Sequence, residues 1–145
     1  MRNPRFTRTA PNLIKGGGAA LLLEKIVAYS SARYAIVADE SKAVATLGTK
    51  FPLPVEIVGA ARRSVEIALG GLGASCVLRE GVRKCGPVIT DNGNWILDCL
   101  WRSPVDPAEM EREIKLLPGV VEVGFFTRLR PEAFIARADG TVERR

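Results

Sequence analysis

The order of apolar segments between residues 52 and 126 constrains the fold more than any other feature of this 145-residue sequence. β-Branched runs typical of strands alternate there with longer stretches typical of helices. The predicted strands are residues 55–58, 75–79, 95–101 and 120–126, and the predicted helices are residues 60–72 and 107–117. Asp106 and Pro107 are a typical N-cap and first helical residue for the second helix. This order of elements predicts the ferredoxin-like split βαββαβ motif.

The residues on either side of this motif predict part of a parallel sheet. Residues 34–38 form a continuous apolar run, which predicts a strand that is buried on both faces. A helix is expected over residues 19–32, and a strand over residues 133–138 is expected to return to the same sheet. The predicted fold class is therefore α/β, a partial Rossmann-like parallel-sheet domain with an inserted ferredoxin-like (βαββαβ) α+β lid domain.

Two prolines in the run Phe51-Pro52-Leu53-Pro54 mark the expected domain boundary, because proline removes a backbone donor and forces an extended path. We expect residues 1–51 and 127–145 to form the partial α/β catalytic domain and residues 52–126 to form the lid domain. The first eleven residues contain three arginines and no acidic residue, and we expect them to be a frayed leader.

Composition excludes several classes of protein. The net charge of +5 suits an anionic partner, but the basic residues are scattered and only 6% of residues are aromatic, so no nucleic acid partner is expected. The longest apolar run, residues 19–23, is much shorter than the roughly 20 residues of a membrane-spanning helix. The absence of a secretory signal and of a CxxC spacing among Cys76, Cys85 and Cys99 favours a cytoplasmic protein without disulfides or a metal site.

The segment Lys15-Gly16-Gly17-Gly18 is a candidate binding site for an anion. It joins a cation to three glycines immediately before a predicted helix. Glycine lets the backbone approach a ligand closely, and the start of a helix presents free amide donors and the positive end of the helix dipole. A flexible turn between two elements is the alternative interpretation.

Glu24 is the candidate general base, and it too has two interpretations. It could face a half-buried pocket near the glycine loop, where desolvation would bring a carboxylate toward the basicity that proton transfer needs. It could instead be a solvated residue that pairs with Lys25 or Arg33. No residue in the chain is a histidine, so mechanisms that use a histidine base are excluded.

Two further polar segments follow predicted strands. Lys42 lies just after the strand at residues 34–38, where ligands gather in open α/β sheets, but Asp39 and Ser41 could equally be a helix cap and Lys42 a surface charge. Residues 90–94 are rich in turn-forming residues and predict a hairpin connection.

Five motifs occur in a fixed order along the chain. They are residues 12–21 (NLIKGGGAAL) with residues 24–26 (EKI), residues 37–42 (VADESK), residues 51–56 (FPLPVE), residues 86–94 (GPVITDNGN) with residues 96–98 (ILD), and residues 118–124 (PGVVEVG). With these motifs the chain, from about residue 12 to its end, resembles the ribose-5-phosphate isomerase A family.

The resemblance implies an aldose-ketose isomerase that converts D-ribose 5-phosphate to D-ribulose 5-phosphate in the non-oxidative branch of the pentose phosphate pathway. Glu24 matches the proton acceptor of the family, which moves a proton from C2 to C1 through an enediolate. Lys15 with Gly16, Gly17 and Gly18 matches the substrate loop, and Lys42 matches a further substrate-binding lysine. The resemblance implies no cofactor or metal, a sugar phosphate as ligand, and a homo-oligomer, either a dimer or a tetramer.

The sequence differs from the family pattern before residue 12. Family members have there a threonine- and serine-containing phosphate loop and an Asp-Gly-Ala-Asp motif, which residues 1–11 do not contain. The alternative expectation is therefore a truncated, catalytically impaired protein of the same family that binds sugar phosphates or serves in oligomerisation.

Overall fold

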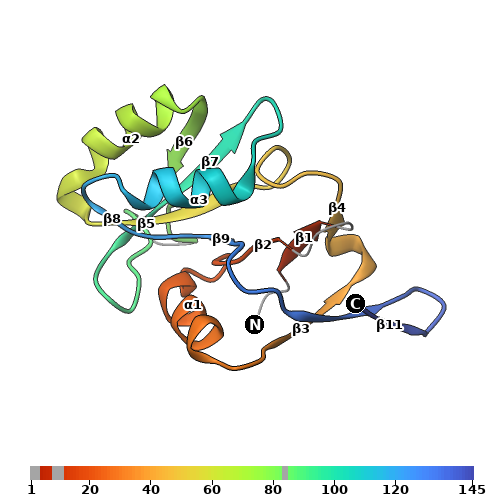
Figure 1. Cartoon of the computed structure of the whole chain (residues 1–145). Helices are drawn as coiled ribbons and strands as arrows, with labels where there is room; N and C mark the ends of the chain where they lie inside the picture. The colour runs from red at the N-terminus through yellow and green to blue at the C-terminus, as the bar shows by residue number, and fades with distance from the viewer. Residues whose placement is uncertain (1–3, 8–11, 83–84) are drawn as a thin grey trace.

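The computed structural model describes residues 4–7, 12–82 and 85–145. Its largest sheet has four antiparallel strands and carries two helices (Figure 1). The elements are β5 (Leu53–Ile57), α2 (Arg62–Gly71), β6 (Ala74–Leu78), β7 (Trp95–Trp101), α3 (Pro107–Lys115) and β8 (Val120–Val123). The strand order β6-β7-β5-β8 is that of a ferredoxin-like sheet, so the predicted βαββαβ order is confirmed. The Asp106 carboxylate accepts from the Ala108 N–H at 2.8 Å, which confirms the predicted cap of α3.

The two faces of this sheet differ in character because successive strand residues point to opposite sides. One face packs against the helices to form an apolar core. That core includes Val55, Ile57, Leu97 and Cys99 from the strands with Val65, Leu69 and Ile114 from the helices. Glu56, Asp98 and Glu122 lie at the alternate positions and form a polar face, on which Glu122 binds Lys25.

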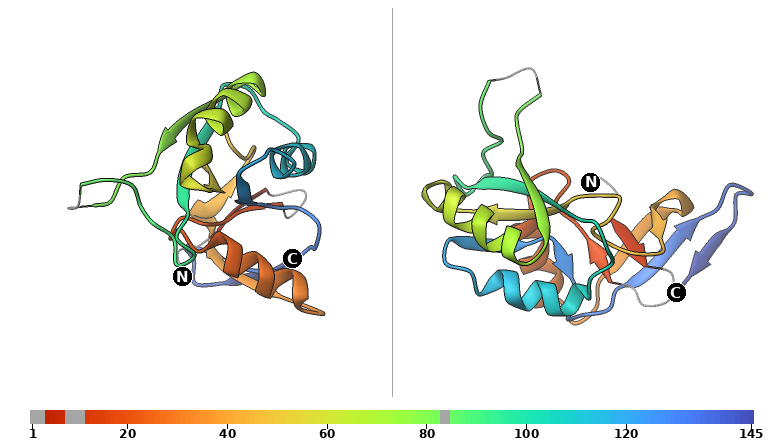
Figure 2. Two further views of the ribbon diagram at one scale, coloured as in Figure 1. Left: turned by 90° about the vertical axis from the view of Figure 1, so that its left-hand side faces the viewer. Right: turned by 90° about the horizontal axis from the view of Figure 1, so that it is seen from above.

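The remaining elements are β1 (Arg5–Thr7), β2 (Leu13–Ile14), α1 (Leu21–Ser30), β3 (Ala35–Asp39), β4 (Ala43–Val44), β9 (Phe125–Phe126), β10 (Glu132–Ala136) and β11 (Val142–Arg144). Their strands form two further sheets, one of four short strands and one of three. Their sheet orders are β4-β1-β2-β9 and β11-β10-β3. Figure 2 shows the β10–β11 hairpin extending to the side away from α2. Among the described residues, no helix is both long and apolar enough to cross a membrane.

The predicted return of the last strand to the first sheet is confirmed, because β10 pairs in parallel with β3 over five residues, from Glu132 opposite Ala35 to Ala136 opposite Asp39. The prediction that the strand at residues 34–38 is buried on both faces is wrong. Ile36 and Ala38 pack against Ala28 of α1, whereas Val37 on the other face is 69% exposed. The described part of the chain covers only one side of β3. A continuous apolar run in this sequence therefore does not mean that both faces of the strand are buried.

The expectation of a frayed leader is also wrong for residues 5–7. These residues form β1, which pairs with β2 on one side and β4 on the other, and the Phe6 side chain is only 1% exposed. Residues 1–3 and 8–11 lie outside the described residues. The sequence did not predict this strand because Phe6 is its only buried apolar residue, and the surrounding arginines resemble an unstructured segment.

Gly124 separates the predicted strand at residues 120–126 into β8 and β9 and joins the two halves of the fold. Its N–H donates to the Pro54 carbonyl at 2.8 Å, and its carbonyl accepts from the Lys15 N–H at 2.9 Å. A Cβ at this position would lie 2.7 Å from the Lys15 carbonyl oxygen and 2.8 Å from the Pro54 carbonyl oxygen. Only glycine allows three backbone segments to approach so closely.

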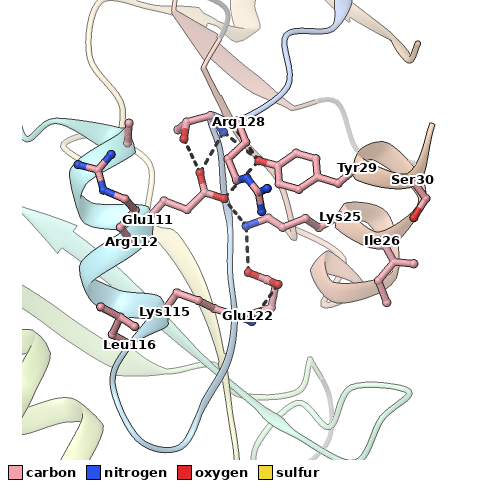
Figure 3. Close-up of a pocket in the computed structure, with 12 residues that line it drawn as sticks. Lys25, Ile26, Tyr29, Ser30, Glu111, Arg112, Lys115, Leu116, Glu122 and Arg128 are labelled. Carbon is pink, nitrogen blue, oxygen red and sulfur yellow. Dashed lines mark hydrogen bonds and ion pairs between the residues drawn. The ribbon is translucent and has the colours of Figure 1, made fainter. Parts of the chain in front are cut away.

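Lys25 of α1 is buried and ties this helix to α3 and β8 (Figure 3). Its ammonium group donates to Glu111 Oε1 at 2.8 Å, to Glu122 Oε1 at 3.0 Å and to the Val123 carbonyl at 2.6 Å. Glu111 also accepts from the Thr127 N–H at 3.0 Å. All three donors of the ammonium therefore have acceptors, which is the condition under which a buried charge is tolerated.

Replacing Gly124 with alanine will destabilise the fold by about 1–3 kcal/mol, because the added Cβ overlaps two backbone carbonyls that cannot move independently. Urea unfolding of the two proteins measures the change. Gly70→Ala is the matched control, since a Cβ at Gly70 has nothing within 4 Å and alanine favours a helix. Equal stability of Gly124→Ala and the unmodified chain would contradict the close packing at Gly124.

Lys25→Met will cost about 3–5 kcal/mol of folding free energy, because it removes the cation that pairs with buried Glu111 and one of the two lysines that pair with buried Glu122. Arg33→Met serves as control. Arg33 pairs with Glu132 through a side chain that is 76% exposed, and an exposed pair contributes about 1 kcal/mol or less. A loss in Lys25→Met no larger than in Arg33→Met would refute the role of the buried network.

The same network predicts how stability depends on pH. Burial raises the pKa of Glu122, but the Lys25 ammonium and the hydrogen bonds to this carboxylate outweigh burial and hold the pKa below its ordinary value of 4.5. Stability from Glu122 is therefore present above pH 4.5 and is lost as the pH falls through the lower folded-state pKa. Acid unfolding followed by circular dichroism checks this, and Lys25→Met should show a weaker dependence in that range.

Candidate active site

The glycine loop turns the chain sharply from β2 into α1. Gly16 has a φ of +97°, and its carbonyl accepts from the Ala19 N–H at 3.0 Å. A Cβ on Gly16 would lie 2.8 Å from the Leu21 Cβ, so a larger residue would both strain the backbone and collide with the first residue of the helix. This geometry brings the start of α1 next to Lys15, as the sequence predicts.

The structure places the Glu24 carboxylate beside Lys15. Lys15 Nζ lies 3.2 Å from Glu24 Oε1, and the two side chains are only 11% and 13% exposed. The alternative pairing of Glu24 with Lys25 or Arg33 is wrong, because Lys25 binds Glu111 and Glu122 and Arg33 binds Glu132. Consecutive residues of an α-helix point about 100° apart, so Glu24 and Lys25 lie on different faces of α1 and bind different partners.

A cavity of about 560 Å³ opens beside the glycine loop. Its walls combine the loop with residues from β1, from the turn before β4, from the Phe51–Pro54 segment and from β6. The lining residues are Arg5, Ile14, Lys15, Gly16, Gly17, Lys42, Phe51, Pro52, Pro54 and Arg79. Lys15, Gly16, Gly17 and Lys42 thus meet in one cavity, whereas Gly18 and Glu24 do not line it.

Lys42 lies at the end of a capped turn and also lines the cavity. Asp39 caps the short turn at Glu40–Lys42 by accepting from the Ser41 N–H at 3.0 Å. Lys42 Nζ lies 3.9 Å from Asp39 Oδ2 and still lines the cavity. A cap and a cavity cation are therefore compatible, because the cap fixes where the lysine starts.

Arg79 is a cavity residue that sequence reasoning missed. Its guanidinium donates to Asp98 Oδ2 at 2.8 Å and to the Gly16 carbonyl at 2.9 Å. Arg79 directly follows β6, and Asp98 lies on the neighbouring strand β7 close to it in register. The sequence signal was limited to an acidic and a basic residue at neighbouring positions of the β6-β7 pair. Together Asp98 and Arg79 fix the glycine loop against the β6-β7-β5-β8 sheet.

The predicted hairpin at residues 90–94 is present, since the Thr90 N–H donates to the Asn94 carbonyl at 2.8 Å. Its side chains also serve a buried acid. Thr90 Oγ1 and Asn94 Nδ2 each donate to Glu56 Oε1 at 2.9 Å, while Glu56 Oε2 is buried without a hydrogen-bond partner among the described residues. The turn-forming residues therefore hold a carboxylate on the polar face of the sheet.

A larger cavity of about 820 Å³ lies between α1 and α3, over the Lys25 network (Figure 3). Tyr29 stands at its wall, and burial raises the pKa of this phenol to about 12, with Glu111 acting in the same direction. Every acceptor around Lys25 is already engaged in the network. The smaller cavity is the better candidate site because it contains the glycine loop and cations that line open space.

The cysteines are separate from both cavities. Cys85 is exposed in the connection after β6 and Cys99 is buried in the apolar core, as a loop thiol and a small hydrophobic residue. Cys76 faces Cys99 across adjacent strands with the two sulfur atoms 3.1 Å apart. The described residues hold no cluster of three or more His, Cys, Asp or Glu that suits a metal ion.

Comparison with known proteins agrees with this geometry. The family model described as ribose 5-phosphate isomerase A (phosphoriboisomerase A) matches residues 7–140. Ribose-5-phosphate isomerase A of Treponema denticola is 52% identical over 134 residues, which are 91% of this chain and 56% of the relative. The enzyme of Treponema pallidum is 55% identical over 135 residues, 92% of this chain and 53% of the relative. The chain spans about half the length of these curated relatives.

Solved structures show the same relationship. Ribose 5-phosphate isomerase A from Methanocaldococcus jannaschii superposes with a TM-score of 0.91 at 44% identity, covering 97% of this chain and 61% of that one. A D-ribose-5-phosphate isomerase in complex with phospho-erythronic acid superposes with a TM-score of 0.92 at 38% identity, covering 99% of this chain and 62% of that one. On these matches and the fold that they share, the chain belongs to the ribose-5-phosphate isomerase A family.

Proposed function

We propose that the site formed by Lys15, the glycine loop and Glu24 isomerises D-ribose 5-phosphate to D-ribulose 5-phosphate, a step of the non-oxidative branch of the pentose phosphate pathway. The observation that carries this proposal is the half-buried Glu24 carboxylate 3.2 Å from Lys15 Nζ at the mouth of its own helix. The names of the relatives support the reaction, and the phospho-erythronic acid bound to one of them supports a phosphorylated ligand.

Glu24 is the proposed base. It takes the proton from C2 of the open-chain aldose, and the electrons of the C–H bond form an enediolate with the carbonyl. The hydroxyl proton on O2 passes to O1, and Glu24 returns the carbon-bound proton to C1, so that C2 becomes the carbonyl of the ketose. A single carboxylate can serve both carbons because they are adjacent, and a proton transfer of this kind contributes about 10²- to 10⁴-fold to the rate.

The cations supply the second part of the mechanism. The negative charge that develops on the substrate oxygen needs donors that are already in place. Lys15, with the backbone amides of the loop at Gly16, Gly17 and Gly18, fills this role in the proposal. Lys42 binds a further anionic part of the substrate. Arg79 does not need to touch the substrate, because its bond to the Gly16 carbonyl fixes the loop.

We further propose that residues 1–51 and 127–145 act as the catalytic domain and residues 52–126 as its lid, and that the protein works as a cytoplasmic homo-oligomer, either a dimer or a tetramer. The β6-β7-β5-β8 sheet lies wholly within residues 52–126 and supports this division, while β9 pairs with β2 and connects the lid to the catalytic domain. Analytical ultracentrifugation measures the oligomeric state, and a strictly monomeric protein would contradict this part.

Glu24→Gln will lower kcat by about 100-fold or more with little change in KM, because it removes the base and keeps the shape of the side chain. Ribulose 5-phosphate formation by the 145-residue chain measures this effect. Glu113→Gln is the matched control, since it removes one exposed carboxylate from α3. Equal rates for the Glu24 variant and the unmodified chain would remove Glu24 from the mechanism, and binding without turnover in the unmodified chain would contradict the proposed reaction.

A further inference from the structure

All charged residues that line the cavity beside the glycine loop are basic. They are Arg5, Lys15, Lys42 and Arg79. The proposed mechanism uses Lys15 and Lys42, and Arg79 holds the loop. Arg5 has no role in it, although Arg5 comes from a separate strand and faces the same space.

Strand register brings three of these cations to one edge of a sheet. In β1, Phe6 lies opposite Ala43 of β4, so Arg5 is level with Lys42. On the other side of β1, Arg5 lies opposite Ile14 of β2, next to Lys15. Lys42 directly precedes β4 and Lys15 directly follows β2, so Arg5 lies between two lysines, and an anion bound there would offset the repulsion among these positive charges.

The Arg5 guanidinium is held in place by neutral groups. Its carbon lies 3.4 Å above the centre of the Phe51 ring, and Nη1 donates to the Ser41 carbonyl at 2.8 Å. An arginine that stacks on an aromatic ring keeps its remaining donors in a fixed plane, the arrangement that suits the oxygens of a phosphate.

The other three cations already have carboxylate partners. Lys15 pairs with Glu24 at 3.2 Å, Lys42 lies 3.9 Å from Asp39, and Arg79 pairs with Asp98. Arg5 makes no ion pair with any residue in the described ranges, so its charge is the one in the cavity that no protein carboxylate within 4.0 Å offsets.

We propose that Arg5, together with Lys42, is the subsite that binds the phosphate group of the ligand. This inference rests on the sugar-phosphate substrate proposed above and adds a residue that the family motifs do not assign. Lys42 contributes a point charge, and Arg5 contributes the fixed planar donors that recognise a tetrahedral oxyanion. Phe51 and Ser41 act on this subsite only through Arg5.

Calorimetric titration of the 145-residue chain with inorganic phosphate, D-ribose 5-phosphate and D-ribose tests the subsite. Arg5→Gln should weaken the binding of both phosphate ligands by about 10- to 100-fold and leave the response to ribose unchanged, because only the phosphate contact is lost. The phosphate affinity of Arg5→Lys should lie between that of the unmodified chain and that of Arg5→Gln, since lysine keeps the positive charge and lacks the planar guanidinium donors. Arg63→Gln is the matched control, because it removes one positive charge from a side chain that is 84% exposed on α2.

Unchanged phosphate affinity in Arg5→Gln overturns the inference, as does an equal loss in Arg63→Gln, which would reflect net charge alone. Thermal unfolding identifies an Arg5→Gln protein that has lost its fold. In that case the comparison of Arg5→Lys with Arg63→Gln decides, and full phosphate affinity in Arg5→Lys overturns the inference. Binding is measured without turnover, so a chain that binds phosphate through Arg5 but makes no ribulose 5-phosphate keeps this inference and contradicts only the proposed reaction.

Discussion

The buried ammonium of Lys25 is the interaction on which the arrangement of the molecule depends. It donates to acceptors on α3 and β8, which are 86 to 98 residues away in the sequence, and so fixes α1 against the β6-β7-β5-β8 sheet and its helix α3. A buried ion pair is seldom the most stable way to fill a site, but its donors and acceptors must match one geometry. Hydrophobic contacts on the same helix would tolerate a rotation that this network does not.

That rotational constraint matters because Glu24 and Lys25 are consecutive. When Lys25 is bound on one face of α1, Glu24 is directed to a face about 100° away, where Lys15 and the glycine loop lie. The loop is fixed in turn by Arg79, whose own orientation is set by Asp98 on the neighbouring strand. The positions of Glu24 and Lys15 therefore depend on two sets of charged contacts. One includes Lys25 and Glu122 and the other includes Arg79 and Asp98, and both glutamate and aspartate partners lie on the polar face of the same sheet.

The sequence predicts the elements of this fold better than it predicts their surroundings. The βαββαβ order follows from local apolar periodicity and caps, and the glycine loop follows from its composition. The partners of Lys25 could not be predicted, because Glu111 and Glu122 look like ordinary surface acids until the helices pack. Arg5 was assigned to a frayed leader for the same reason, and Val37 was placed in a two-sided core although only one face of β3 is covered.

Gly124 couples the positions of two parts of the fold through its backbone. Its two peptide groups bond to β5 on one side and to the backbone of Lys15 on the other, so the four-stranded sheet cannot swing away without pulling on the residue that holds the ammonium against Glu24. The spacing of Lys15 and Glu24 therefore depends on backbone bonds to a single residue without a side chain.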